Sequence, residues 1–306
     1  MKIKYPLLID GGLSNVLEAM GHNLNHILWS AKLLDENPEA IITAHLDYLK
    51  AGAKCITSAS YQASLQGFME HGLKQTDAEK LILKSVQLAE IAIQKHLKTS
   101  NSKDKALIAA SIGPYGAYLA DGSEYRGNYG ISDEELRAFH HSRIQILDHS
   151  NADFFACETI PSFQEAKVLG ELLKGTKKKA WISFSCQDEK HLNDGTLLED
   201  CVSYFNVHPN IFALGVNCTD PKYLSKIIQL IKESSRKKIV VYPNSGEVYQ
   251  ASTKTWIGIS NPLEYTSICK EWISLGADII GGCCRIGPEH IKSVRNVIQN
   301  ITDSNN

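Results

Sequence analysis

The chain has 306 residues, of which 43% are hydrophobic, so it can bury a large core and does not have the composition of a disordered or collagen-like protein. Its 32 Lys and Arg against 34 Asp and Glu give a net charge of −2, which argues against nucleic acid or anionic membranes as partners. No apolar run approaches the roughly 18 residues of a membrane span, and the first residues lack the apolar segment of a secretory signal. We expect a cytoplasmic protein that binds small neutral or zwitterionic molecules.

Short β-like runs alternate with segments of helical periodicity along the chain. In order, the runs cover residues 7–11, 54–60, 107–113, 153–158, 180–186, 212–218, 239–243 and 278–283. Between them, apolar side chains recur at helical spacing, as at Ile82, Val86, Ala89 and Ile93. Asn or Asp followed by Pro marks expected helix starts at 37–38, 220–221 and 261–262. This alternation is typical of βα units with a parallel sheet.

Eight such units in a chain of this length predict an α/β fold, a single (β/α)8 TIM-type barrel over residues 1–306 with a frayed tail at 302–306. The alternative is a doubly wound open sheet. That fold usually carries a glycine-rich phosphate loop after its first strand, whereas the sequence here is DGGLSN from Asp10 to Asn15 and not GxGxxG. The barrel is therefore the preferred interpretation.

In a barrel of this kind, reactive groups lie where the strands end, on one rim. Cys218 ends the sixth run and Cys283-Cys284 ends the eighth, so their sulfurs can converge. Three thiolates leave a tetrahedral ion one open position, as in catalytic zinc sites. Gly281 and Gly282 would let the backbone bend so that both adjacent sulfurs face one ion. The alternatives are small buried side chains or a redox-active pair.

The remaining cysteines and the histidines give no comparable cluster. We interpret Cys55, Cys157, Cys186, Cys201 and Cys269 as reduced packing residues. The histidines form no HExxH motif, and His45, His140, His141 and His191 are expected to be surface or helix residues.

Two motifs carry a resemblance to a known family. GVNC at 215–218 and GGCCR at 281–285 look like the signature of the homocysteine S-methyltransferase family. SIGPYGAYLADGSEYRG at 111–127 and YPNSGE at 242–247 resemble most its cobalamin-independent branch, which uses S-methylmethionine. The resemblance implies a barrel with zinc at the carboxyl ends of its strands, bound by Cys218, Cys283 and Cys284. It further implies that homocysteine and a sulfonium methyl donor are the substrates and methionine is the product.

The resemblance also assigns substrate residues. Asp10, the backbone at Gly11, and Glu158 would bind the amino-acid end of homocysteine, Ser58 would contact substrate, and Asn217 lies beside a zinc ligand. A helix cap or a salt bridge is the structural alternative for the two acids. For Glu158, inside the apolar run FFACETI, burial without a partner would be costly, which favours a functional role.

A sulfonium carries charge but no N–H group, so aromatic faces and carboxylates suit it. Trp29 is the first aromatic candidate because relatives place a donor-side ring there, and the others are Tyr115, Tyr118, Tyr125 and Trp256. The loop 121–127 could be a lid or a solvated turn. Arg285 could tune the zinc site or anchor its own loop.

Other functions remain open from the sequence. The same homocysteine site could use betaine or S-adenosylmethionine as donor. A non-catalytic thiol protein, either a redox sensor or a zinc store, is the alternative from a different class. The sequence contains no heptad pattern or other signal that would predict an oligomeric state.

Overall fold

The computed structural model describes residues 3–26, 28–100, 104–250, 255–257 and 261–304. Its main sheet contains only parallel strands, in the order β1-β10-β7-β6-β5-β4-β3-β2. The strands are β1 (Leu7–Leu8), β2 (Cys55–Thr57), β3 (Leu107–Ile112), β4 (Phe154–Ile160), β5 (Ala180–Phe184), β6 (Ile211–Asn217), β7 (Lys238–Tyr242) and β10 (Ile279–Ile280). A parallel bridge between Ile9 and Cys55 joins the first strand to the second. The sheet is therefore closed into the predicted TIM-type barrel.

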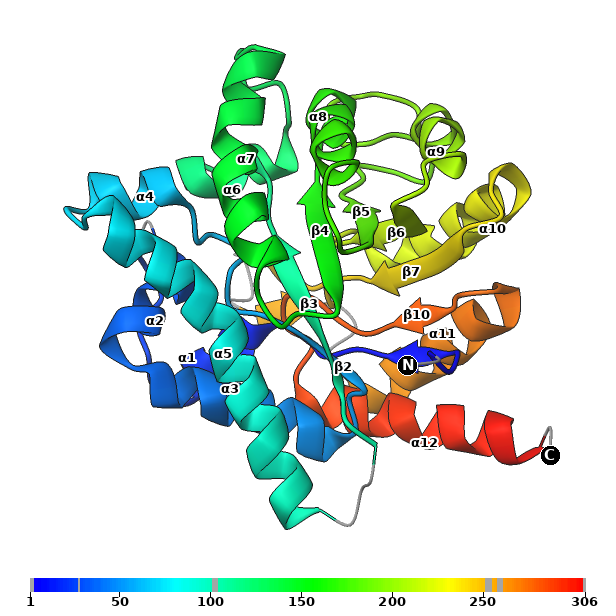
Figure 1. Ribbon diagram of the computed structural model, residues 1–306. Coiled ribbons are helices and arrows are strands. Elements are labelled where there is room, and N and C mark those ends of the chain that lie inside the picture. The colour runs from blue at the N-terminus through cyan, green and yellow to red at the C-terminus, as the bar shows by residue number, and fades with distance from the viewer. Residues whose placement is uncertain (1–2, 27, 101–103, 251–254, 258–260, 305–306) are drawn as a thin grey trace.

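Helices surround the strands on the outside of the barrel (Figure 1). The α-helices are α1 (Leu13–Ala19), α2 (Leu33–Glu36), α3 (Pro38–Ala51), α4 (Leu65–Glu70), α5 (Gln75–Thr99), α6 (Tyr115–Leu119), α7 (Asp133–Asp148), α8 (Phe163–Leu173), α9 (Leu198–Asn206), α10 (Leu224–Ser234), α11 (Pro262–Leu275) and α12 (Pro288–Ser304). Short 3-10 helices are η1 (Trp29–Lys32), η2 (Ser123–Tyr125) and η3 (Pro221–Tyr223). Among these described helices, none is both long and apolar enough to cross a membrane.

Local sequence explains where several helices begin and end. Asn37 accepts a hydrogen bond from the amide of Ala40 and is followed by Pro38, so α3 begins where the Asn-Pro pair predicts. It ends at Gly52, whose φ of 115° lies in the left-handed region that glycine tolerates. The last helix, α12, continues to Ser304, beyond residue 302 where a frayed tail is expected, and its Ile291 and Val294 are buried. Residues 305 and 306 lie outside the described part.

The core has two parts that follow from the alternation of strand side chains. Residues pointing into the barrel include Ile9, Phe154, Trp181 and Ile279. Residues on the opposite face of each strand pack against the helices and form the larger cluster. Because both faces of each strand are buried, the strands are continuous apolar runs, and all eight can therefore be predicted from the sequence.

Two details differ from the predicted elements. An antiparallel hairpin of β8 (Val248–Gln250) and β9 (Thr255–Ile257) follows β7 and is not expected from the sequence. The last barrel strand, expected over 278–283, is only Ile279–Ile280. Backbone hydrogen bonds to the neighbouring segments continue beyond Ile280, from the Gly281 amide to the Val241 carbonyl at 3.2 Å and from the Cys283 amide to the Pro243 carbonyl at 2.8 Å. These bonds hold Cys283 at the rim of the barrel.

Candidate metal and substrate site

A cavity of about 490 Å³ lies at the carboxyl ends of the parallel strands. Its wall is built from residues at or just after the ends of β1, β2, β3, β4, β6, β7 and β10. The residues predicted for the site all line this cavity; they are Asp10, Gly11, Trp29, Ser58, Glu158, Asn217, Cys218, Cys283 and Cys284. The strands thus bring together side chains that are far apart in the sequence.

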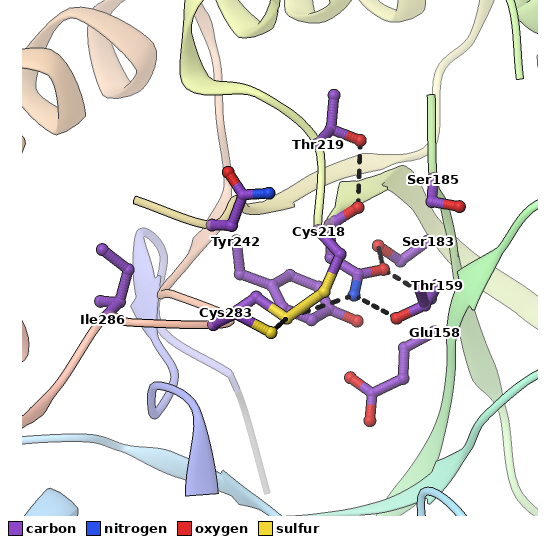
Figure 2. The surroundings of a disulfide bond; sticks show 12 residues. Glu158, Thr159, Ser183, Ser185, Cys218, Thr219, Tyr242, Cys283 and Ile286 are labelled. Carbon is purple, nitrogen blue, oxygen red and sulfur yellow. Dashed lines mark hydrogen bonds between the residues drawn. A yellow bond between two sulfur atoms is a disulfide. The ribbon is translucent and has the colours of Figure 1, made fainter. Parts of the chain in front are cut away.

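The three thiols at the end of β6 and after β10 form one cluster, with their sulfurs all within 4.8 Å of one another. Cys218 has φ of 47°, which turns the chain out of β6. The structure joins Cys218 and Cys283 in a disulfide, with 5.7 Å between their Cα atoms (Figure 2). The sulfurs of Cys283 and Cys284 lie 3.9 Å apart.

The donor set of this cluster fits a soft, tetrahedral metal ion once the disulfide is reduced. Ligand sulfurs about 2.3 Å from a tetrahedral zinc ion lie ~3.8 Å from each other, close to the 3.9 Å between Cys283 and Cys284. Three cysteine ligands leave the fourth position of such an ion for a substrate atom. Among the described residues, this is the cluster of His, Cys, Asp and Glu side chains that could hold a metal ion.

Gly281 and Gly282 support this cluster for a reason that differs from the expected one. Neither has a positive φ, so conformational freedom is not what these positions require. A Cβ at Gly281 would lie 2.6 Å from the carbonyl oxygen of Asp10, and one at Gly282 would collide with Ile286. The Asp10 segment and the thiol loop therefore pack backbone to backbone, and the Gly282 amide donates to the Asp10 carbonyl at 3.0 Å.

The carboxyl group of Asp10 is held at the cavity floor by β2. It accepts hydrogen bonds from the Thr57 amide at 2.8 Å and from the Thr57 hydroxyl at 3.2 Å. Burial raises the pKa of Asp10 well above its usual range, and the nearby charge of Glu158 adds to this rise. A cationic group in the cavity would relieve both effects.

Glu158 projects from β4 into the same cavity and accepts a hydrogen bond from the Ser111 hydroxyl of β3. Burial raises its pKa to about 7, although hydrogen bonds from Ser111 and Tyr242 oppose the rise. Tyr242 is itself oriented by the indole N–H of Trp181, which donates to its hydroxyl at 3.0 Å. Figure 2 shows Glu158, Tyr242 and the joined Cys218 and Cys283 around the same space. Two acids therefore lie beside a thiol cluster.

Comparison with known proteins identifies the family of this chain. The model of the homocysteine S-methyltransferase family matches residues 7–298. The chain belongs to that family. It is 48% identical over 295 residues to homocysteine S-methyltransferase YbgG of Bacillus subtilis, covering 95% of this chain and 94% of the relative. It is also similar to homocysteine methyltransferase MmuM of Escherichia coli in its metallated form, with a TM-score of 0.86, 42% identity and coverage of 95% and 96% of the two chains. The oxidized form of MmuM gives a TM-score of 0.85.

Membership of the homocysteine S-methyltransferase family and the likeness to MmuM confirm the predicted family and fold, and one relative of that family is known in a metallated form. Ser58 and Asn217 line the cavity of this family member, but their side chains are bonded to protein groups. The Ser58 hydroxyl lies 2.7 Å from that of Ser60 and accepts from the Ser111 amide at 3.1 Å. The Asn217 side chain accepts from the Thr159 amide at 2.6 Å and lies 3.9 Å from the Cys283 sulfur. Both positions brace the strand ends.

The aromatic candidates divide into two groups. Trp29 lines the cavity and makes an edge contact with Tyr61, with 6.0 Å between the ring centroids. Tyr125 also lines it and is hydrogen-bonded to Cys284. Tyr115 and Tyr118 instead pack on Phe139 of α7, outside the cavity wall. The structure gives these two candidate rings a packing role, because α6 turns them toward the helices. The Trp256 side chain lies outside the described residues.

Arg285 anchors its own loop. Its guanidinium group forms an ion pair with Glu247, and its amide donates to the Asn15 side chain at 3.0 Å. This geometry favours anchoring over tuning of the thiol site. It also ties the YPNSGE segment to the thiol loop, since the Ser245 amide donates to the Cys284 carbonyl at 3.1 Å.

Several cavity residues are not predicted from the sequence. Thr57, Tyr61, Ser111, Glu124 and Tyr242 all line the cavity. Each lies within, or next to, a segment already identified: Thr57 precedes Ser58, and Ser111 and Tyr242 begin the SIGPYG and YPNSGE motifs. Their positions in or beside these motifs could have indicated that these residues belong to the site. The sequence could not indicate which of their side chains face the cavity, because that depends on strand register.

Proposed function

We propose that this protein transfers a methyl group from S-methylmethionine to homocysteine, giving methionine from both molecules, with Zn²⁺ bound by Cys218, Cys283 and Cys284. The observation that carries the proposal is the convergence of three sulfurs with the carboxyl groups of Asp10 and Glu158 in one cavity. That combination suits a substrate with a thiol at one end and an ammonium group at the other.

The protein groups hold the two ends of homocysteine. Cys218, Cys283 and Cys284 would hold Zn²⁺, and the ion would supply the Lewis acidity that favours the thiolate form of the substrate at neutral pH, since a free thiol with a pKa of about 8.5 is mostly protonated. Asp10 and Glu158 bind the ammonium group, and Thr57, Ser111 and Tyr242 keep the two acids in place. The chain thereby fixes the direction from which the sulfur attacks.

The charge of the cavity supports a cationic donor. In the described part of the chain, no Lys or Arg side chain lines the cavity, while the acids Asp10, Glu18, Glu124 and Glu158 do. Trp29 and Tyr61 add aromatic rings, which attract a sulfonium. In the transfer, the homocysteine sulfur forms a bond to the methyl carbon as the bond from that carbon to the sulfonium sulfur breaks. The donor leaves as a neutral thioether, and the proton of the homocysteine thiol is released to solvent when the substrate binds.

The decisive experiment measures metal content and methyl transfer together. The purified chain is reduced, supplied with Zn²⁺ and assayed with homocysteine and S-methylmethionine carrying an isotope-labelled methyl group. We expect a zinc-to-chain ratio near unity and label in methionine. Parallel assays use betaine and S-adenosylmethionine. Transfer from betaine with none from S-methylmethionine would contradict the proposed donor, and a metal-free active enzyme would contradict the role of zinc.

Two cysteine variants distinguish loss of the metal site from the general effect of removing a thiol. Cys283→Ala is expected to lose zinc and methyl transfer while its circular dichroism spectrum stays that of the wild type. Cys269→Ala is the control, because Cys269 is buried in α11 outside the cavity wall. It should keep both zinc and activity despite some loss of stability.

A further inference from the structure

Glu124 also lines the cavity and comes from the short 3-10 helix η2, not from a barrel strand. Its Oε2 atom is buried, and in the described part of the chain that atom has no hydrogen-bond partner. A carboxylate oxygen removed from water without a partner costs free energy unless a ligand supplies one. Because Glu124 faces a cavity, the ligand is the natural source.

The backbone around Glu124 is built to hold it there. Gly116 of α6 packs directly on η2, since a Cβ at Gly116 would collide with the Glu124 amide nitrogen and lie 2.6 Å from the Ser123 carbonyl carbon. The Ser185 hydroxyl, after β5, donates to the Glu124 carbonyl at 3.3 Å. The Asp121 carboxylate accepts from the Ser123 amide at 2.9 Å. These contacts exclude the interpretation of 121–127 as a merely solvated turn.

The nearest cation of the loop is already engaged elsewhere. Arg126 lies 3.4 Å from the Asp121 carboxylate and donates to the Ser123 hydroxyl at 3.1 Å. Burial raises the pKa of Glu124, and the charge of Asp121 raises it further while Arg126 opposes this. The protein thus leaves this carboxylate without a strong internal counterion.

The groups around Glu124 select a particular kind of cation. Glu124 lines the same cavity as the aromatic rings of Tyr61 and Trp29. Tyr61 in turn contacts the edge of Trp29. A cavity that offers both a carboxylate and aromatic rings suits a cation that has charge but no N–H to donate.

We propose that Glu124 is the specificity-determining residue for the methyl donor, with its carboxylate facing the positive sulfur of the sulfonium while Asp10 and Glu158 bind the homocysteine ammonium. This inference rests on the proposed function. The charge on the donor sulfur disappears on transfer, so Glu124 favours binding of the charged donor over the neutral thioether product. It distinguishes donor from product without taking part in bond making.

The test compares Glu124→Gln with the wild type and with Glu79→Gln. Glu79 is a half-buried residue of α5 that accepts a hydrogen bond from Gln75 and does not line the cavity, so its substitution removes the same charge outside the site. Steady-state assays on the zinc-loaded, reduced protein give the KM of each substrate. We expect the KM for S-methylmethionine to rise at least tenfold in Glu124→Gln with less than a twofold change in the KM for homocysteine, and no change in Glu79→Gln. Glu124→Asp should recover part of the loss.

A binding measurement isolates the sulfur charge. In the absence of homocysteine no transfer occurs, so calorimetry can compare the dissociation constants of S-methylmethionine and methionine, which differ only in the methyl group and charge on sulfur. We expect wild-type preference for the sulfonium to fall about tenfold in Glu124→Gln. Unchanged preference, or an equal rise in the homocysteine KM, would overturn the inference while leaving the proposed function intact. A wild-type protein that does not use S-methylmethionine would instead refute the proposed function.

Discussion

Glu165 in α8 is completely buried, whereas Glu158 in β4 is partly exposed to the cavity, and the partners of the two carboxylates differ. Glu165 accepts hydrogen bonds from the His140 ring at 2.8 Å and the Tyr129 hydroxyl at 2.9 Å, and a further one from the Tyr115 amide. Arg143 donates to the other His140 nitrogen at 2.7 Å, so the ring nitrogen that faces Glu165 carries the proton. Glu158 has the Ser111 and Tyr242 hydroxyls and otherwise faces the cavity.

This difference teaches how the same side chain becomes structural in one place and available to a ligand in another. The fold satisfies the lone pairs of Glu165 with groups from α6, α7 and the segment between them, so the carboxylate joins those elements to α8. The fold leaves Glu158 beside the cavity and without a basic partner. The unused hydrogen-bonding sites of Glu158 and its exposure to the cavity together separate the two roles.

The largest expected effect comes from breaking the satisfied network. Glu165→Gln removes the negative charge beside buried His140 and Arg143 and turns one accepting oxygen into a donor. We expect the free energy of unfolding to fall by about 3 kcal/mol, as when one partner of a buried ionic network is lost. Urea denaturation followed by circular dichroism measures this change. The KM for homocysteine, measured on the remaining folded protein, should stay within about twofold, and an unchanged stability would contradict the structural role.

Glu158→Gln should show the opposite pattern. The substitution removes a carboxylate that faces the cavity, so the homocysteine KM should rise on the order of 10- to 100-fold, the loss of one charge-assisted contact. The stability of the ligand-free protein should be equal or slightly higher, because a buried charge has been removed. Zinc content should not change. A wild-type KM for homocysteine in this variant would contradict the assignment of Glu158 to the ammonium group.

The pH dependence of binding sharpens the same comparison. With a pKa of about 7, Glu158 loses its negative charge as the pH falls through neutrality, so its attraction for an ammonium group weakens below pH 7. We expect the homocysteine KM of the wild type to rise by up to about tenfold per pH unit from this group below its pKa. The substrate thiol contributes its own pH dependence. The homocysteine KM of the wild type and of Glu158→Gln, measured from pH 5.5 to 8.5, separates the contribution of Glu158 from that of the substrate thiol. Only the contribution of Glu158 should disappear in the variant.

The barrel could be predicted because strands buried on both faces leave an unmistakable pattern of apolar runs. Cys218, Cys283 and Glu158 could be placed on one rim for the same reason, since each ends such a run. The sequence could not show which side chains at the rim turn inward. Tyr115 comes shortly after the end of β3, yet its ring packs on Phe139 and not in the cavity. Glu124 does line the cavity, but it comes from a loop whose course depends on contacts with Gly116 and Ser185.

The glycines and histidines show a related limit. Gly281 and Gly282 could be recognised as necessary to the thiol loop, but close packing on Asp10 and Ile286 depends on segments from the two ends of the chain. His45 and His140 lie in helices, as expected, yet both are completely buried. A polar side chain at one position of a helical pattern can be buried in an apolar contact or in a hydrogen-bonded network, and only the neighbouring helices decide between them.

His45 extends the comparison to a group that is buried without any partner. Among the described residues, neither of its ring nitrogens has a hydrogen-bond partner, whereas both nitrogens of His140 are bonded. Burial lowers the pKa of His45 to about 4, so the folded state binds its proton less readily than the unfolded chain does at an ordinary pKa of 6.5. Stability is therefore lost as the pH falls below 6.5 and until it passes the folded pKa.

His45→Leu should have the smallest effect of this series at neutral pH, a gain of about 1 kcal/mol in the free energy of unfolding, because an unsatisfied polar group is replaced by an apolar one. Below pH 6.5 the gain should grow by about 1.4 kcal/mol per pH unit until it levels off near pH 4. Denaturation curves of both proteins at several pH values measure the gap between them. A constant gap across this range would mean that His45 takes up its proton equally in the folded and unfolded states, and the fold would then have to provide a partner for the charged ring.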